Sequence, residues 1–162
     1  MKKSKEETQL ITDWLRLAQE NLQVATSTIT AEYAPYHTVC FLCQNSAERY
    51  LKAYLIYQGW ELKKTHDLNE LLLFCVEYNN KLETLRDDCE ILNEYITSAR
   101  YPGDLPFDNF DEEQAQEAIT SANRISETIQ KEINLQISND TISSETDNQT
   151  PSDLDNNSNQ KI

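Results

Sequence analysis

Apolar residues recur at intervals of three and four through most of positions 1–137, which is the period of amphipathic helices. The pattern predicts five helical segments and no strand, with the helices over about residues 4–29, 35–58, 67–76, 82–99 and 111–136. In the first segment we expect one apolar stripe to face the core: Leu10, Ile11, Trp14, Leu15, Ala18, Leu22, Ala25 and Ile29. Long helices with short connections pack as antiparallel neighbours. The predicted fold is therefore all-α, an up-and-down bundle of four main helices plus a short extra helix.

Start and stop signals support these segments. Residue pairs with capping-box chemistry stand three apart where three of the helices begin: Ser4 with Glu7, Asp67 with Glu70, and Asp111 with Gln114. Pro35 suits the first turn of the second helix and Gly59 suits its end.

Composition agrees with an all-helical chain. Only 2 Gly and 4 Pro occur among 162 residues, which is too few for the turns of a sandwich, a barrel or a doubly wound α/β fold. There are 28 acidic and 14 basic residues, giving a formal net charge of -14. A charge of this sign repels phosphate backbones, so it disfavours broad coating by nucleic acid, although not a local basic pocket.

The chain changes character after Ile137. Residues 138–162 are rich in Ser, Asn, Asp and Thr and contain no aromatic residue, a composition that cannot offset its ordering entropy. We therefore expect a helical bundle over residues 1–137 and a disordered acidic tail over 138–162. The N-terminus has no apolar segment typical of a signal peptide, and the longest apolar run, residues 71–76, is far shorter than the roughly 20 residues of a membrane span. The expected location is the cytoplasm, with no membrane association.

Four cysteines occur at positions 40, 43, 75 and 89. Cys40 and Cys43 have the spacing of a CxxC motif, but they lie within an apolar helix, and no second Cys or His pair is close in sequence. We expect buried thiols rather than a metal or redox site, and no metal ligand set is predicted. The sequence also lacks the common phosphate-loop, nucleophile-elbow and zinc-protease signatures.

Candidate chemistry lies in polar residues near the helix junctions. Glu48 and Lys52, four apart on the second helix, share one face and either line a cleft or form an exposed ion pair worth roughly 0.2–0.5 kcal/mol. His66 precedes the third helix, beside Lys64. There it either contributes to an anion site at the free amides of the helix N-terminus or packs beside the capping residue.

Arg100 and Tyr101 follow the apolar pattern of the fourth helix. Arg100 either satisfies the last carbonyls of the helix or, beside the Tyr101 ring, meets a phosphate or a base.

Three motifs follow one another along the chain: residues 43–55, CQNSAERYLKAYL; residues 64–68, KTHDL; and residues 99–102, ARYP. On a five-helix pattern, this order and spacing resemble the HEPN family, the higher eukaryotes and prokaryotes nucleotide-binding domain, over nearly all of residues 8–135. The resemblance implies a helical bundle, commonly a homodimer, often encoded with a minimal nucleotidyltransferase partner. It also implies a nucleotide or phosphate pocket made of Glu48, Lys52, His66, Arg100 and Tyr101, with a possible bound nucleotide and no required cofactor.

Many HEPN proteins resemble metal-independent endoribonucleases, and in toxin–antitoxin pairs the HEPN chain is the toxin. Those proteins use an Arg followed four to six residues later by a His. Here the positions at this distance after Arg100 hold no His; residues 104–107 are Asp104, Leu105, Pro106 and Phe107. No other Arg has a His at that spacing. Without an imidazole at this position, RNA cleavage would lack its usual proton-transfer group.

Two function classes therefore stay open. In the first, the protein is a non-enzymatic module that binds a nucleotide and a nucleotidyltransferase subunit. In the second, it is a divergent ribonuclease toxin in which His66 replaces the missing histidine and Arg100 stabilises the charge on phosphorus. A third possibility is a structural helical adaptor in which these polar residues are only caps.

Overall fold

Six helical elements make up the described part of the chain. The computed structural model describes the backbone of residues 3–100 and 110–146, and the side chains of residues 3–95 and 110–140. The elements are α1 (Lys5–Thr28), α2 (Tyr36–Tyr57), α3 (Leu68–Tyr78), the 3-10 helix η1 (Asn80–Leu85), α4 (Arg86–Arg100) and α5 (Glu112–Thr146). No strand occurs among these residues, so the predicted all-α class is confirmed.

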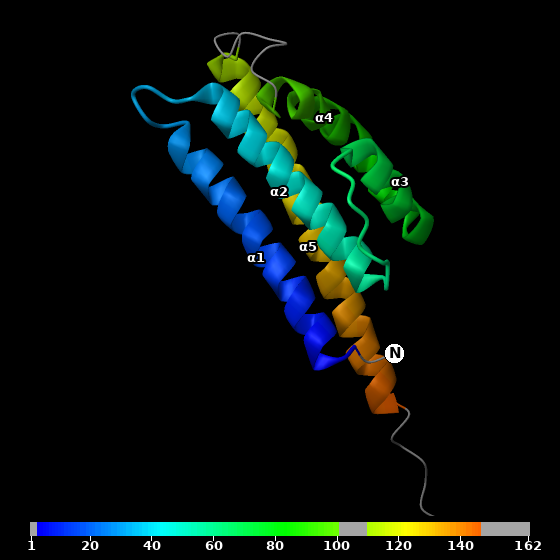
Figure 1. Ribbon diagram of the computed structural model, residues 1–162. Coiled ribbons are helices and arrows are strands. Elements are labelled where there is room, and N and C mark those ends of the chain that lie inside the picture. The colour runs from blue at the N-terminus through cyan, green and yellow to red at the C-terminus, as the bar shows by residue number, and fades with distance from the viewer. Residues whose placement is uncertain (1–2, 101–109, 147–162) are drawn as a thin grey trace, which may run out of the picture.

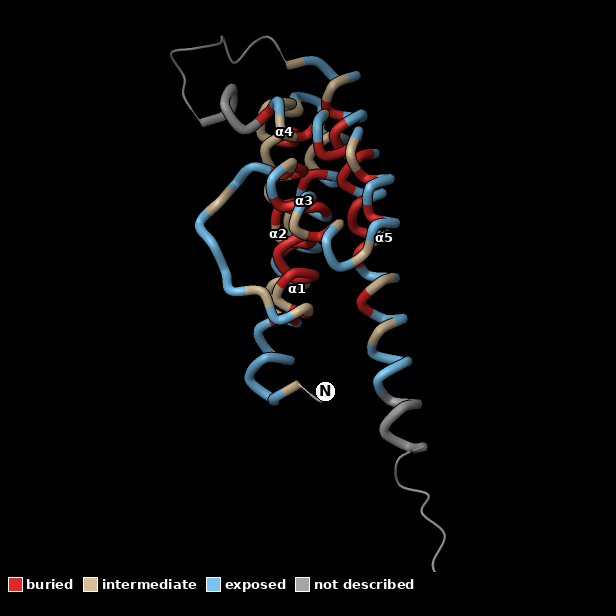
Figure 2. The backbone as a smooth tube through the Cα atoms, turned by 90° about the vertical axis from the view of Figure 1, so that its right-hand side faces the viewer, coloured by how far each residue is buried: buried red, intermediate tan, exposed pale blue. Residues whose placement is uncertain are grey.

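Helix α2 is the centre of the bundle. It contacts α1, α3, α4 and α5, and Figure 1 shows α1 and α5 running beside it while α3 and α4 cover another side. Chain direction alternates along α1, α2, α4 and α5, with the short α3 as the extra helix (Figure 1). Buried residues gather where these helices meet, whereas α5 is mostly exposed over residues 134–140 (Figure 2). Because α2 is surrounded, even its charged residues Glu48 and Lys52 are buried.

Local capping chemistry sets where the helices begin. Ser4 and Glu7 form a reciprocal capping box at α1, in which the amide of Glu7 donates to the Ser4 hydroxyl at 3.1 Å. Asp111 and Gln114 pair in the same way at α5, over distances of 3.1 and 2.8 Å. Gly59 follows α2 with a φ of +89°, a conformation that glycine adopts readily.

The cap of α3 differs from the prediction. Asp67 is the N-cap and accepts from the amides of Asn69 and Glu70. The carboxylate of Glu70, however, accepts from the Thr65 hydroxyl at 2.6 Å, so the expected contact to the Asp67 amide is replaced by one to the preceding segment.

Three further expectations need correction. The predicted fourth helix is divided into η1 and α4, which meet between Leu85 and Arg86. Helix α5 continues to Thr146, so the boundary predicted at Ile137 is too early for the helix, and the tail prediction for residues 147–162 lies outside the described residues. Leu10 is 47% exposed and does not face the core, although its neighbour Ile11 does. None of the helices in the described part of the chain is long and apolar enough to cross a membrane.

Candidate functional site

A line of polar residues runs along one face of α2 at every fourth position. Gln44, Glu48 and Lys52 share this face, and all three are at least nine-tenths buried. The Lys52 ammonium donates to Glu48 Oε1 at 2.7 Å. The predicted pairing of Glu48 with Lys52 is therefore present, but as a buried ion pair, and the exposed alternative is wrong.

His66 completes this group from the segment that precedes α3. Its Nδ1 lies 3.1 Å from both carboxylate oxygens of Glu48. Gln44 Nε2 donates to the carbonyl of His66 at 3.2 Å and lies 3.5 Å from Glu48 Oε2. We call Gln44, Glu48, Lys52 and His66 the Glu48 cluster, because the one carboxylate contacts all three other side chains.

The cluster is closed on the α2 side and open on the His66 side. The side chain of His66 is 52% exposed, whereas those of Glu48 and Lys52 are 8% and 6% exposed. The Lys52 ammonium also lies 5.8 Å from the centre of the Trp14 ring on α1. His66 is therefore the solvent-accessible member of the cluster, while the Lys52 ammonium balances the charge of the buried carboxylate.

Helix α4 holds the backbone on which His66 stands. Asn93 Oδ1 accepts from the amide of Leu68 at 3.0 Å, and its Nδ2 donates to Asp67 Oδ1 at 3.2 Å. Together with the Asp67 cap, these bonds occupy the amides of residues 68, 69 and 70. The expected anion site at free amides of the α3 N-terminus is therefore not available, because those amides are already bonded.

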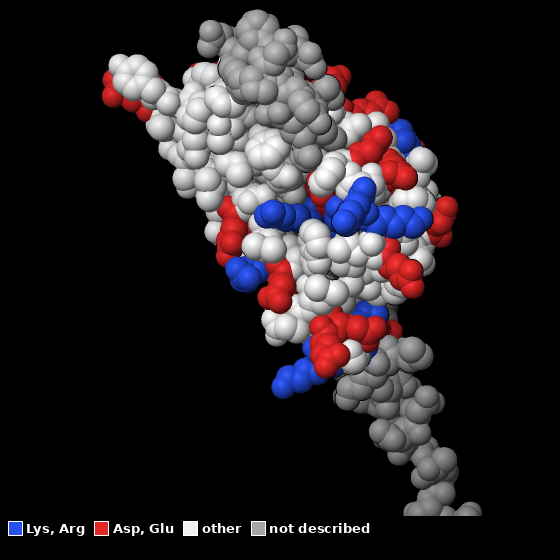
Figure 3. Space-filling view, in the orientation of Figure 1, with Lys and Arg blue, Asp and Glu red and all other residues white. Residues whose placement is uncertain are grey.

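Two exposed basic residues precede His66 in the chain. Lys63 and Lys64 are exposed in the segment between α2 and α3, and the ammonium of Lys63 lies 4.8 Å from the centre of the Phe74 ring. Figure 3 shows several Lys and Arg side chains in a band across the middle of the pictured face, with Asp and Glu side chains above and below it. The described backbone of α4 ends at Arg100, whose side chain, like the whole of Tyr101, lies outside the described residues.

The four cysteines lie in the hydrophobic core. All four are free and buried, as predicted. Burial raises the pKa of Cys40, Cys43 and Cys89 to about 12 and raises that of Cys75 as well. Among the described residues no group of three or more His, Cys, Asp or Glu side chains is placed to hold a metal ion.

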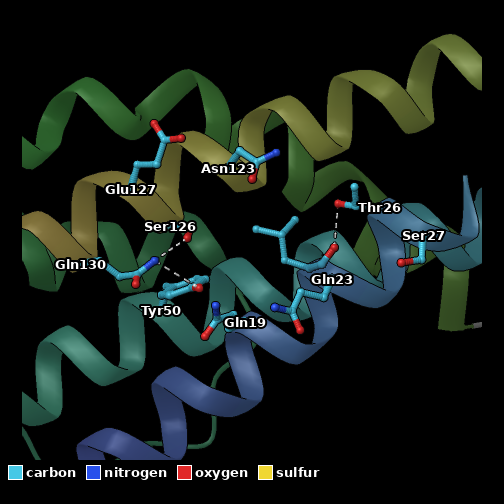
Figure 4. A pocket seen from close by; sticks show the side chains of 10 residues that line it. Gln19, Gln23, Thr26, Ser27, Tyr50, Asn123, Ser126, Glu127 and Gln130 are labelled. Atoms are coloured by element: carbon cyan, nitrogen blue, oxygen red, sulfur yellow. Dashed lines mark hydrogen bonds between the residues drawn. The ribbon is translucent and has the colours of Figure 1, made fainter.

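A hollow lies between α1 and α5, and the sequence pattern gave no signal for it. It has a volume of about 600 Å³ and is lined mainly by amides and hydroxyls, among them Gln19, Gln23, Asn123, Ser126 and Gln130 (Figure 4). Tyr50 lies at its base and accepts a hydrogen bond from Gln130 Nε2 at 3.4 Å. Because Tyr50 is two residues from both Glu48 and Lys52, this hollow lies on the opposite side of α2 from the Glu48 cluster.

The sequence model of the HEPN domain matches residues 11–133, most of the chain. The chain belongs to the HEPN family. Two solved structures resemble this HEPN domain in fold. An archaeal HEPN homologue, ST0689, is 29% identical, with a TM-score of 0.63 over 76% of this chain and 97% of the other.

The second structure is TT1696 from Thermus thermophilus, which is 26% identical, with a TM-score of 0.68 over 75% of this chain and 96% of the other. A search of curated protein sequences finds no match. The HEPN match spans α2, the Glu48 cluster and α4. The Glu48 cluster therefore lies within the family's domain, whereas residues 134–162 lie outside it.

Proposed function

We propose that this HEPN protein is a non-enzymatic module that binds a nucleotide or phosphate ligand at the Glu48 cluster and engages a partner protein. The ligand site comprises Glu48, Lys52, His66, Arg100 and Tyr101. The observation that carries the proposal is the contact of His66 Nδ1 with the buried Glu48 carboxylate, which holds a half-exposed imidazole at the edge of a charge-balanced cluster. The partner is a second copy of the chain together with a minimal nucleotidyltransferase subunit.

The division of roles within the site follows from exposure. Lys52 is neutralised by Glu48, so it supports the site, whereas His66 and the exposed Lys63 and Lys64 are the groups that meet an anion first. Arg100 adds a guanidinium suited to bidentate contact with phosphate, and Tyr101 adds a ring for stacking. No Arg–His pair of the ribonuclease spacing is present in the sequence, which favours binding over catalysis.

Thermal unfolding with saturating ATP, GTP or AMP tests this function. A ligand at a hundred times its dissociation constant stabilises the folded state by about 2.7 kcal/mol, which raises the melting temperature by several degrees. His66→Gln should abolish most of this rise. His37→Gln is the matched control, because His37 lies on the first turn of α2, about 16 Å along the helix from Glu48. An unchanged melting temperature with all three nucleotides would contradict the proposal.

A divergent endoribonuclease is the second candidate, favoured by the same contact between Glu48 and His66. A carboxylate bonded to Nδ1 fixes the ring and leaves Nε2 as the nitrogen that could exchange a proton with a ribose hydroxyl. In that case Arg100 would stabilise charge on the reacting phosphorus. Metal-free incubation with labelled total RNA decides between the two functions. Cleavage by the wild type that His66→Gln and Arg100→Ala both abolish would favour the enzyme, and intact RNA would favour the binding module.

A further inference from the structure

Helix α1 carries an apolar stripe that the rest of the described chain does not cover. Leu10, Leu17 and Val24 stand seven residues apart and are 47%, 36% and 52% exposed. The half-buried Trp14 and Asn21 lie between them on the same face. The five positions are therefore spaced alternately by four and three residues, as in a seam where two helices pack together. A stripe with this spacing lies along one face of the helix for about 21 Å.

A parallel stripe on α2 widens this face. Two contacts set the antiparallel register of the helices: Lys52 lies against the Trp14 ring at 5.8 Å, and Arg49 Nη1 donates to the Leu17 carbonyl at 3.4 Å. Continuing this register by one turn in each direction places Ile56 beside Leu10 and Asn45 beside Asn21. Leu42, one turn further, then lies beside Val24. These α2 residues, Lys52 apart, are half-buried. We call the two stripes together the α1–α2 face.

We propose that a second copy of this chain docks on the α1–α2 face, with the two-fold axis near Leu17. The inference rests on the homodimer of the proposed function and identifies the surface that forms it. The α1 stripe is symmetric about Leu17, because Leu10 and Val24 each lie seven residues from it. When two such helices pack antiparallel, Leu17 meets its own copy and Leu10 meets Val24, so the surface is complementary to itself.

The polar position in the stripe fits the same arrangement. In an antiparallel pair centred on Leu17, Trp14 of one copy is opposite position 20 of the other, one residue from Asn21 on the seam. The indole N–H requires an acceptor when it is buried, and the Asn21 side chain offers one. A single Asn in an otherwise apolar seam also favours one register over others.

Charge supports this face as the place where two acidic molecules meet. The whole chain carries -14, so two copies repel each other over most of their surfaces. On the α1–α2 face, Arg49 and Lys52 offset Glu48. At the edge of the α1 stripe, Arg16 lies 3.9 Å from Asp13 and 2.9 Å from Glu20. The local charge is therefore close to neutral, and the apolar stripe can make contact there.

The area that a stable interface must bury explains why both α1 and α2 are needed. A stable interface buries about 800 Å² on each partner, which is more than one helical seam usually provides. Two antiparallel helices facing two others would form a four-helix arrangement of the kind that packs well. This dimer would also cover Trp14, and hence one side of the Glu48 cluster, while the His66 side faces away from α1.

Site-directed cross-linking tests the face. Leu17→Cys is expected to form a disulfide-linked dimer rapidly under a mild oxidant, because Leu17 meets its own copy on the axis. Leu10→Cys and Val24→Cys should cross-link much faster when mixed than when either is oxidised alone. Leu73→Cys, a 54% exposed position on α3, is the control and should form no disulfide-linked dimer. The four native thiols are buried and should not interfere.

Light scattering with Leu17→Glu gives an independent result. The dimer dissociation constant should rise at least tenfold, whereas Leu73→Glu should leave it unchanged. A wild-type chain that is monomeric at all concentrations would overturn both the face and the homodimer. A dimer that survives Leu17→Glu, or that cross-links through Leu73 and not Leu17, would overturn the face alone. Nucleotide binding is scored separately, so its failure is distinguishable from either result.

Discussion

The Glu48 carboxylate joins the other members of the Glu48 cluster, because it contacts the side chains of all three. It is buried, bonds the Lys52 ammonium and lies 3.1 Å from the His66 ring nitrogen. Removing a charge from water is costly, and only the opposite charge and good hydrogen bonds offset that cost. Loss of the carboxylate would therefore leave the Lys52 ammonium buried without a counter-charge.

The first prediction concerns this pair. Glu48→Gln should lower the free energy of unfolding by about 3–5 kcal/mol, because it leaves a buried charge uncompensated. The double variant Glu48→Gln with Lys52→Met should recover much of that loss. Glu20→Gln is the control, since its exposed pair with Arg16 contributes less than about 1 kcal/mol. Urea unfolding measures the free energy of unfolding of the wild type and of the three variants. A loss below about 1 kcal/mol for Glu48→Gln would mean that the pair is not buried.

The second prediction concerns the thiols. Burial raises the pKa of Cys40, Cys43 and Cys89 to about 12, so the folded state keeps protons that the unfolded state releases above about pH 8.5. The stability from these protons is complete below that pH and is lost as the pH rises toward 12, by up to about 1.4 kcal/mol per thiol per pH unit. Urea unfolding between pH 8 and 10 should show this fall, and Cys89→Ala should make it shallower.

Thiol reactivity checks the same point without unfolding the protein. At pH 8 a thiol reagent such as Ellman's reagent should leave the native chain unmodified and should titrate all four thiols in denaturant. Rapid reaction of the native protein would show that the cysteines are not buried.

At the scale of the elements, local signals could be read from the sequence and contacts between elements could not. The capping box of Ser4 and Glu7 was predictable because both partners lie within one turn. Which side of α1 faces the core was not, because Leu10 and Ile11 both fit the helical period and only the position of α2 separates them. The bond from Thr65 to Glu70 shows the same limit, since the path of the connecting segment brings Thr65 to the carboxylate that was expected to accept from the Asp67 amide.

The third prediction concerns the junction of α3 and α4. Asn93→Ala removes the acceptor for the Leu68 amide and the donor to Asp67, so stability should fall by about 1–2 kcal/mol. Hydrogen exchange at residues 66–70 should accelerate, because the segment that positions His66 then loses its hydrogen bonds to α4. Asn80→Ala, at an exposed position of η1, is the control and should change neither quantity. Unchanged exchange in Asn93→Ala would show that α4 does not hold this segment.

At the scale of the whole molecule, the site is assembled from parts far apart in the sequence. The spacing of Glu48 and Lys52 was visible in the sequence, but their burial follows from the central place of α2. The contact of His66 with Glu48 spans 18 residues, and only the resemblance to HEPN proteins suggested it. Gln44 and Asn93 hold the segment that contains His66, but the sequence pattern gave no functional signal for either residue. Their hydrogen-bond partners include backbone groups that only folding brings close.

The net charge also acts at this scale. Two copies of a chain carrying -14 repel each other, and salt screens that repulsion. The fourth prediction is therefore that the homodimer becomes tighter as NaCl rises from 50 to about 300 mM, a range in which the screening length falls below about 10 Å. Sedimentation equilibrium measures the dissociation constant at each concentration. Weakening with salt would mean that ion pairs, and not an apolar face, hold the two copies together.

The most direct test of ligand binding at the Glu48 cluster is an NMR titration of the histidine rings with ATP. The chain contains only two histidines, so the imidazole signals separate into those of His66 and those of His37, and His66→Gln assigns them. The account predicts that the His66 signals shift and saturate as ATP is added while those of His37 stay in place. Signals of both rings that remain unchanged at millimolar ATP, in a folded sample, would contradict it.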